Sequence, residues 1–430
     1  MAGERGRLLL LLPTSTYRAP EMMAAAHRLS LRVSVGSEQR NVLAEQDPEG
    51  YLVLDFEDVE RSISVVRDFS KRYPIAAVVG VDDDTTVLAA FLAKELSLPG
   101  NPVESVHASR NKRLMRERLQ AAQVPIPEYH AWSLGENPQR LSSHVAYPCV
   151  LKPTTLSASQ GVIRANDQAE FVQAWTRIAM IIQSQEAAPE ILVESFVPGR
   201  EVALEGLLDH GSLHVLAIFD KPDPLDGPYF EETIYVRPSR LPDQVQAQVE
   251  ACAVKAIDAL GLRIGPIHAE FRINQAGPWV LEVAARPIGG RCSRTLRFDV
   301  GASLEELILR QALGLDISAV RPDPTPSGVM MIPIPQAGVL QAVEGVEAAR
   351  AVPGVEEVLI TAHQGQAITP PPEGSRYLGF IFSRARMPEA VEQALRQAHQ
   401  QLRVVIKPDG QEVASDRRAT SLHQERAACR

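Results

Sequence analysis

Several features that would point to a particular function are scarce in this sequence. Its 430 residues hold four cysteines, far apart and without CxxC or Cys/His spacing, so neither a disulfide framework nor a cysteine-based metal site is indicated. No apolar run approaches the roughly 18 residues that a membrane-spanning helix needs. The net charge of −9 argues against a general surface for nucleic acid or anionic membrane. We therefore expect a cytoplasmic protein that binds neither nucleic acid nor membrane.

The first hundred residues alternate between apolar runs and helix-like segments, which is typical of a parallel, doubly wound sheet. The run Leu8–Leu12 faintly resembles the start of a signal peptide, but Pro13 ends it and no cleavage pattern follows, so a buried strand is the better interpretation. Asp82, Asp83 and Asp84 follow a strand at the edge where such sheets bind ligands, although a simple helix N-cap is favoured. The expected strands are 8–12, 31–35, 51–56 and 75–81, and the expected helices are 20–29, 57–72 and 85–96.

Two basic elements come next. Residues 107–119 predict a single basic amphipathic helix that carries Lys112, and such a charge run is by itself usually a solvated helix face. A strand then ends at Lys152 and leads into a loop of small hydroxyl residues closed by Gly161. Such a loop either wraps phosphates with its backbone amides or is an ordinary hairpin loop. Its spacing matches neither a Walker A motif nor GxGxxG.

The rest of the chain has an α+β pattern. Residues 145–290 predict antiparallel hairpins with helices at about 167–184 and 242–260. A proline-rich connection at 321–328 precedes the last segment, and residues 409–430 are polar, aperiodic and expected to be disordered. The expected strands of the last segment are 329–334, 355–360, 377–383 and 402–406, and its expected helix is 388–401.

The stretch from Gly265 to Arg294 carries most of the chemistry. Period-two alternation on both sides of a turn at 274–278 predicts a β-hairpin. If Ile273 pairs with Trp279, Glu270 lies opposite Glu282, and two opposed carboxylates destabilise a sheet unless a positive group lies between them. A hard cation bound by the carboxylate oxygens would be that group. The alternative is a solvated hairpin face with scattered charges, and on the hairpin alone the two interpretations have about even weight.

Taken in order, these pieces resemble the ATP-grasp superfamily, specifically its carboxylate–amine ligases. The resemblance rests on Asn111-Lys112, on the strand and loop from Val150 to Gly161, on residues 193–201 and on the hairpin with Gly289-Gly290. It implies a doubly wound N-terminal α/β domain at 1–106, a central ATP-grasp domain at 107–320, and a small C-terminal α+β domain at 321–408 like that of biotin carboxylase. The segment 219–238 and residues 285–294 resemble the L-amino-acid ligases in particular.

The resemblance also implies roles for individual residues. Arg286 would be catalytic, and Glu270 and Glu282 would hold Mg²⁺, or Mn²⁺ in its place. Ala284 departs from the family, since related ligases often have Asn there, so the number of metal ions stays open. The residues expected to bind ATP are Lys112, Lys152, Ser157, Ser159, Gly161, Glu194, Phe196, Val197 and Glu201, and those expected near the substrate are His268, Gly289, Gly290 and Arg291.

The implied activity is ATP-dependent amide formation through an acyl phosphate, with release of ADP and phosphate. The partners would be a small-molecule carboxylate and an amine, here two amino acids, and a homodimer is common in the family. Three alternatives stay open at this point. They are a ligase of the phosphoribosylglycinamide synthetase type, an enzyme of the biotin carboxylase type, for which no biotinyl domain is present, and an ATP-binding module without turnover.

Overall fold

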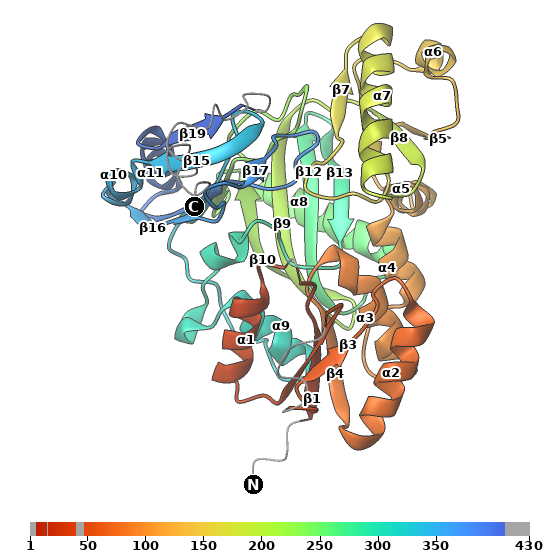
Figure 1. Cartoon of the computed structure of the whole chain (residues 1–430), viewed down its shortest axis with the longest axis vertical. Coiled ribbons are helices and arrows are strands. Elements are labelled where there is room, and N and C mark those ends of the chain that lie inside the picture. Colours follow the sequence, from red (N-terminus) through yellow and green to blue (C-terminus); the bar gives the residue numbers. More distant parts are fainter. Residues whose placement is uncertain (1–5, 15, 40–46, 409–430) are drawn as a thin grey trace, which may run out of the picture.

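The computed structural model describes residues 6–14, 16–39 and 47–408, and the predicted tail at 409–430 lies outside them. Figure 1 shows the N-terminal domain at the base and a long central sheet above it. A small lobe and the C-terminal domain stand on opposite sides of the upper half. The described residues form four sheets with helices packed against them. The predicted mixed α/β and α+β, multidomain fold class is confirmed.

The sheet of the N-terminal domain is parallel, as predicted, and its strands lie in the order β3-β2-β1-β4. Strand β1, one of the two inner strands, is buried along its whole length, as expected for a strand covered on both faces. Leu8 and Leu10 face one core, with α1 and α9 (Leu304–Ala312), while Leu9 and Leu11 face the other, with α2 and α3. The elements are β1 (Arg7–Leu11), α1 (Ala19–Arg28), β2 (Val33–Ser37), β3 (Tyr51–Val53), α2 (Val59–Arg72), β4 (Ile75–Gly80) and α3 (Asp83–Glu95).

The predicted basic helix at 107–119 is wrong as a single element. The structure has two helices, α4 (Val103–Arg110) and α5 (Lys112–Ala121), separated at Asn111. Asn111 adopts an extended conformation, and its side chain accepts hydrogen bonds from the amides of Arg113 and Leu114. Because Asn is among the best N-cap residues, it starts a new helix there. The break places Lys112 at the first position of α5.

A small four-stranded sheet forms the lobe, in the order β5-β8-β6-β7. Helix α7 covers it through Phe171, Trp175 and Ile178, which pack on Leu151 and Val193. The elements of the lobe are β5 (Tyr129–Ser133), α6 (Pro138–Leu141), the 3₁₀ turn Ser142–His144, β6 (Cys149–Pro153), β7 (Ile163–Ala165), α7 (Gln168–Ser184) and β8 (Glu190–Ser195).

The central sheet is antiparallel and has eight strands in the order β13-β12-β9-β10-β11-β14-β18-β16. Helix α8 (Asp243–Leu260) packs on one face and ends at Gly261, whose φ of 76° is the left-handed conformation that favours glycine. The sheet runs across residue 321, because β11 pairs with β14. Its strands are β9 (Arg200–Asp209), β10 (Ser212–Asp220), β11 (Ile234–Arg237), β12 (Gly265–Asn274), β13 (Gly277–Ala284), β14 (Ser327–Ile332), β16 (Val355–Ile360) and β18 (Gly379–Arg384).

The C-terminal domain adds a second small sheet, β17-β15-β19, to the end of the central one. The prediction missed β15 (Gly338–Glu344), while the strands that become β14, β16, β18 and β19 and the helix that becomes α11 were predicted close to their observed bounds. The other elements are α10 (Val346–Arg350), β17 (Ala367–Ile368), α11 (Pro388–Gln400), β19 (Arg403–Lys407) and the 3₁₀ turns Cys292–Thr295 and Asp299–Gly301. Among the described helices, none combines the length and the apolar character that crossing a membrane requires.

Candidate active site

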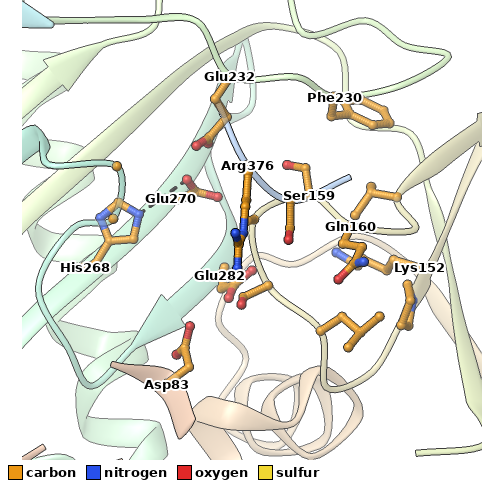
Figure 2. Close-up of a pocket in the computed structure, with 18 of the residues that line it drawn as sticks. Asp83, Lys152, Ser159, Gln160, Phe230, Glu232, His268, Glu270, Glu282 and Arg376 are labelled. Carbon is orange, nitrogen blue, oxygen red and sulfur yellow. Dashed lines mark hydrogen bonds and ion pairs between the residues drawn. The ribbon is translucent and has the colours of Figure 1, made fainter. Parts of the chain in front are cut away.

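A cavity of about 1120 Å³ opens where the N-terminal domain, the lobe, the central sheet and the C-terminal domain meet. All of the residues that the sequence singled out for a site line it, with Gly161 as the one exception. Figure 2 shows that Glu270, Glu282 and His268 face this space from the hairpin, with Lys152 on the opposite side and Asp83 below. Residues from 13 to 380 therefore contribute to one site.

The hairpin of β12 and β13 carries the two acidic residues as predicted, with Glu270 directly opposite Glu282. The pairing near the turn differs from the prediction by one residue, since Ile273 lies opposite Pro278 rather than Trp279. The predicted five-residue loop is a tighter turn, because Asn274 still pairs with Gly277. The φ of 107° at Gly277 explains why glycine ends this turn.

A bulge between the turn and the glutamates restores the predicted pair. Leu281 has no partner on β12, and this extra residue moves each side chain on its turn side to the other face. Val280 is consequently buried in the same core as Val283, and Leu281 lines the cavity. The strict alternation predicted for this strand, with Leu281 on the face of Val283, is therefore wrong.

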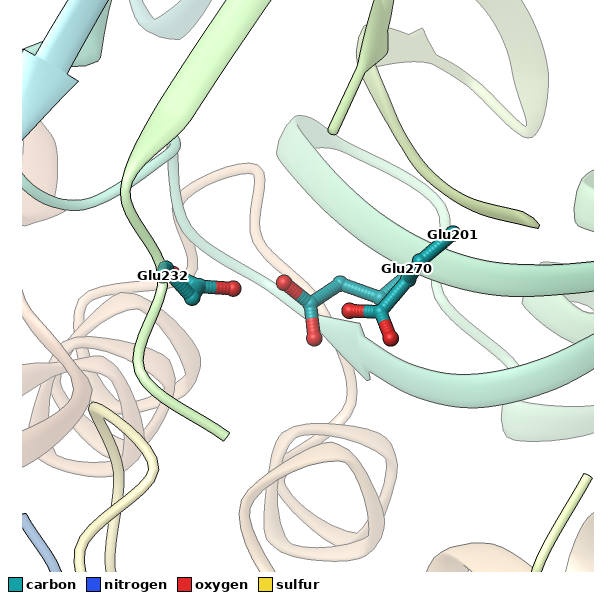
Figure 3. Close-up of side chains that lie close together, drawn as sticks. All are labelled: Glu201, Glu232 and Glu270. Atoms are coloured by element: carbon teal, nitrogen blue, oxygen red, sulfur yellow. The ribbon is translucent and has the colours of Figure 1, made fainter. Parts of the chain in front are cut away.

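Lys221, just after β10, binds three carboxylates at once. Its Nζ lies 2.8 Å from Glu201, 2.6 Å from Glu232 and 2.7 Å from Glu270, and the side chain is 3% exposed. We call these four residues the lysine cluster. Figure 3 shows the carboxylates of Glu201, Glu232 and Glu270 directed toward one another, with oxygens within 4.8 Å. The ammonium of Lys221 occupies the position between these carboxylates that a metal ion would otherwise take.

The electrostatics of the lysine cluster follow from burial and close charges. Burial alone would lower the pKa of Lys221, but the three carboxylates hold it well above its usual value. Burial raises the pKa of Glu232 to about 6, and the neighbouring Glu270 adds to the rise. Burial would also raise the pKa of Glu270, yet Lys221 and His268 hold it well below its usual value. With Lys221 and all three carboxylates ionised, the cluster has a net charge of −2.

His268 lies on the same face of β12 as Glu270, as strand parity predicts. Its Nδ1 contacts Glu205, which is 1% exposed, and its Nε2 lies 3.4 Å from Glu270 Oε1. Burial would lower the pKa of His268, but Glu205 and Glu270 raise it to about 9. An imidazolium between two carboxylates is the form that this pKa favours near neutral pH. Glu205 also accepts a hydrogen bond of 3.1 Å from the amide of Ile288.

Arg286 joins the hairpin to the N-terminal domain. Its Nε lies 2.9 Å from Asp83 Oδ2, and we call this contact the aspartate–arginine pair. Burial would raise the pKa of Asp83, but Arg286 and Arg110 lower it to about 2. Asp82 caps α3 through a capping box with Thr85, so the sequence interpretation of this triplet was right for Asp82. It missed Asp83 as a member of the site.

Two lysines face the cavity from separate elements. Lys112 donates to the carbonyl of Leu156 at 2.7 Å and lies 3.5 Å from Glu282 Oε2. Lys152 lies 2.5 Å from Glu194 Oε2, and burial, the largest effect, lowers its pKa despite that carboxylate. Glu194 also binds Arg116, which is fully buried. The side chain of Glu194 is thus committed to two cations, and its backbone pairs with Val150 in the sheet.

The segment after Glu194, which was expected to bind ATP, forms one wall of the cavity. Phe196 and Val197 line the cavity. The ring of Phe196 lies between two guanidinium groups, 4.2 Å from Arg164 and 5.1 Å from Arg272. Arg272 in turn binds Glu201 at 3.0 Å, so both oxygens of Glu201 already have partners.

The small-residue loop at 154–161 is held by the C-terminal domain. The amide of Gly161 donates to the carbonyl of Pro372 at 2.8 Å, and Gln160 Nε2 donates to the carbonyl of Glu373 at 2.7 Å. Ser157 and Ser159 line the cavity, while Gly161, at φ 72°, anchors the end of the loop. A Cβ at Gly161 would lie 2.8 Å from Pro153 Cγ, which explains the glycine there.

The turn after Arg286 meets the N-terminal domain. The amide of Gly290 donates to the hydroxyl of Tyr17 at 2.7 Å, and Arg291 lies 3.1 Å from Glu21. The predicted use of the Gly290 amide for a substrate therefore competes with an existing hydrogen bond. Gly289 also lines the cavity.

The hairpin carboxylates fit a divalent metal ion. Among the described residues, no partner contacts Oε2 of Glu270 or Oε1 of Glu282, so each glutamate keeps an oxygen free. Such hard oxygen donors suit Mg²⁺. Ala284 lies opposite His268, is 2% exposed and offers no ligand atom. The lysine cluster does not fit a metal ion in this form, because the ammonium of Lys221 already lies between its three carboxylates.

Sequence reasoning did not single out Glu205, Glu232 or Arg376. Glu205 could have been found by alternation, since it lies four residues after Glu201 on β9 and thus on the same face. Glu232 and Arg376 come from irregular segments, where no periodicity shows which way a side chain points.

Comparison with known proteins agrees with this geometry. Residues 23–100 match the ATP-grasp N-terminal domain, residues 145–295 the ATP-grasp domain, and residues 330–407 the L-amino acid ligase C-terminal domain 2. The crystal structure of L-amino acid ligase from Bacillus licheniformis superposes with a TM-score of 0.76. It is 26% identical, and the match covers 94% of this chain and 99% of that one.

Two curated relatives are a ligase and a synthase by name. Alanine–anticapsin ligase of Bacillus subtilis is 24% identical over 72% of this chain and 70% of its own length. Dapdiamide A synthase of Enterobacter agglomerans is 30% identical over 51% of this chain, and the match spans about half, 52%, of that relative.

Proposed function

Because the chain belongs to the ATP-grasp superfamily, among its carboxylate–amine ligases, we propose that it uses ATP to join two amino acids through an amide bond. The observation that carries the proposal is the convergence of Glu270, Glu282 and Arg286 in one cavity of about 1120 Å³. The match of residues 330–407 to the L-amino acid ligase C-terminal domain supports amino acids over the ribosylamine and bicarbonate substrates of other superfamily members.

The reaction has two steps. A carboxylate oxygen of the first amino acid attacks the γ-phosphorus of ATP, the bond from that phosphorus to the β–γ bridging oxygen breaks, and ADP leaves. The amine nitrogen of the second amino acid then attacks the acyl carbon and loses a proton, while the bond from that carbon to the phosphate oxygen breaks. The products are an amide, ADP and phosphate. Positioning and charge neutralisation are the main tasks of the protein in such chemistry.

The basic residues of the cavity supply that neutralisation. Arg286 stabilises the charge that develops on the transferring phosphoryl group and on the tetrahedral intermediate. Lys112 and Lys152 both line the cavity, with Lys112 bound to the carbonyl of Leu156 in the loop 154–161, which we call the phosphate loop, and they bind the phosphates as point charges.

Glu270 and Glu282 hold Mg²⁺, or Mn²⁺ in its place, through their free oxygens. A divalent ion there neutralises charge on the phosphate oxygens. Nucleotide recognition falls to the backbone from Glu194 to Val197 for the adenine. Glu201 accepts from the ribose, since a carboxylate oxygen can take a second hydrogen bond.

The lysine cluster gives the acid substrate its orientation. Glu232 lines the cavity, and its carboxylate attracts the α-ammonium group of an amino acid. His268, the amide of Gly289 and Arg291 also line the cavity and contact the substrate. The loop from Ser157 to Gly161 excludes water from the acyl phosphate.

We also expect a cytoplasmic homodimer, as in many relatives of this superfamily. Light scattering on the purified protein would give twice the mass of 47.0 kDa. A monomeric mass would correct this expectation without affecting the proposed reaction.

The test is release of ADP and phosphate from Mg·ATP with pooled amino acids, comparing the wild type with Arg286→Gln. Arg403→Gln is a matched control, because Arg403 is 79% exposed, lies on β19 and does not line the cavity. Release that needs two amino acids and disappears in Arg286→Gln alone would support the proposal, and dividing the pool would identify the pair. Binding of Mg·ATP without turnover in any mixture would contradict it and favour a binding module.

A further inference from the structure

Arg376 stands apart from the other basic residues of the cavity. Eight lysine and arginine side chains line this space, and seven of them lie within 3.5 Å of a carboxylate. Within the part of the chain that the structure describes, Arg376 has neither an ion pair nor a hydrogen-bonded side-chain partner. Figure 2 shows its side chain directed into the cavity from the C-terminal domain.

The backbone around Arg376 is firmly placed. Pro372 and Glu373 accept hydrogen bonds from the phosphate loop, and the amide of Gly374 donates to Pro370 at 3.0 Å. On the other side, the amide of Leu378 donates to the carbonyl of Ile332 at 3.0 Å, on the central sheet. The backbone that carries Arg376 is therefore held at both ends, and its guanidinium presents the planar donor fork that matches a carboxylate.

The proposed reaction leaves one carboxylate that needs such a partner. The carboxylate of the acid substrate is converted to an acyl phosphate beside Arg286 and the hairpin glutamates. The carboxylate of the amine substrate is not consumed, and it becomes the C-terminus of the dipeptide. A negative group in a cavity that already holds triphosphate and several glutamates would be repelled unless a cation binds it.

We propose that Arg376 binds the α-carboxylate of the amine substrate and so restricts that substrate to α-amino acids. This inference rests on the proposed function. It assigns to the C-terminal domain the selection of the second substrate, while the hairpin and the lysine cluster act on the first. Because Arg376 is exposed and unpaired, its removal leaves no buried charge behind, and a variant there keeps the fold.

The test separates the two half-reactions with hydroxylamine, a small nucleophile without a carboxylate that traps acyl phosphates as hydroxamates. We compare wild type, Arg376→Gln, Arg376→Lys and the exposed control Arg403→Gln. For Arg376→Gln we expect unchanged hydroxamate formation and a KM for the amine amino acid about 10- to 100-fold higher, the cost of a charged hydrogen-bonded pair. Arg376→Lys should recover part of the loss, since it keeps the charge without the fork.

The amide of the same amino acid provides a second readout. Wild type should discriminate against this amide, and Arg376→Gln should treat the amide and the free acid nearly alike. Equal loss of hydroxamate and dipeptide would assign Arg376 to ATP or to the acid and overturn the inference, as would no loss of either. A wild type that forms neither hydroxamate nor ADP with any amino acid would overturn the proposed function, and this inference with it.

Discussion

The lysine cluster and the aspartate–arginine pair are both ion-pair sites in the wall of the same cavity, but they are built differently. In the cluster one ammonium serves three carboxylates, all from the central sheet or from the segment before β11. In the pair one guanidinium serves one carboxylate, and the two come from different domains. The cluster therefore depends on one continuous fold, whereas the pair depends on how the N-terminal domain is docked.

This difference gives the two cations different roles. Buried ion pairs contribute little net stability, because desolvation offsets most of the Coulomb attraction, but removal of one partner is costly. Lys221 is tied to three partners and cannot leave without exposing like charges to one another. Arg286 has one carboxylate partner and a hydrogen bond of 3.0 Å to the carbonyl of Pro287, so fewer charges hold it in place when it turns toward a substrate.

The largest effect should come from Lys221→Met. It leaves Glu201, Glu232 and Glu270 close together without a cation, and we expect the free energy of unfolding to fall by about 3–5 kcal/mol, as for other broken buried pairs. Urea denaturation would measure it, with Lys71→Met, an exposed pair with Asp68, as the control. Added Mg²⁺ or Ca²⁺ should restore stability to Lys221→Met more than to wild type. Equal stability of the two variants would show that the cluster is not held by its charge.

Arg286→Gln should affect catalysis more than folding. We expect kcat to fall about 10²- to 10³-fold, the usual result of removing one preorganised donor at a transition state, while binding of ATP measured by calorimetry stays within a few-fold. Asp83→Asn is the matched variant, because it releases Arg286 without removing it. A loss in Asp83→Asn as large as that in Arg286→Gln would mean that the pair, rather than the guanidinium alone, is required.

The aspartate–arginine pair also predicts how the stability of the folded protein depends on pH. The pKa of Asp83 in the folded protein is about 2, below the ordinary value of 3.8. A depressed carboxyl pKa gives stability that is complete above about pH 4 and is lost as the pH falls toward 2. The difference corresponds to about 2 kcal/mol. Thermal unfolding between pH 6 and pH 3 should therefore decline less steeply in Asp83→Asn than in wild type, and parallel profiles would contradict this.

Local patterns in the sequence predicted much of this site, because strand parity and turn chemistry act over a few residues. Glu270 opposite Glu282 was predicted correctly although the assumed turn register was wrong, since the bulge at Leu281 corrected a one-residue error. No periodic pattern shows such a bulge. The N-cap at Asn111 was readable in principle, but the charged run around it looked continuous.

Contacts between residues far apart in the chain could not be predicted from the sequence, for a different reason. Asp83 meets Arg286 across 203 positions, and nothing local in either segment specifies the other. The same holds for Lys221, whose three partners become neighbours only when β9, β10, β11 and β12 pair. The family resemblance supplied the order of the elements, but not which carboxylate each cation would meet.

The smallest effect should come from Glu373→Ala, on the segment that carries Arg376. The side chain of Glu373 pairs with Arg177, and both are about 40% exposed, at 41% and 38%; such pairs contribute about 0–1 kcal/mol. The phosphate loop is held instead by the backbone carbonyls of Pro372 and Glu373, which the substitution keeps. We therefore expect the KM for ATP to change less than about three-fold, within what a surface pair of this strength can cause. A larger increase that fades with added salt would show that this surface ion pair, unlike the two buried sites, positions the loop through its charge.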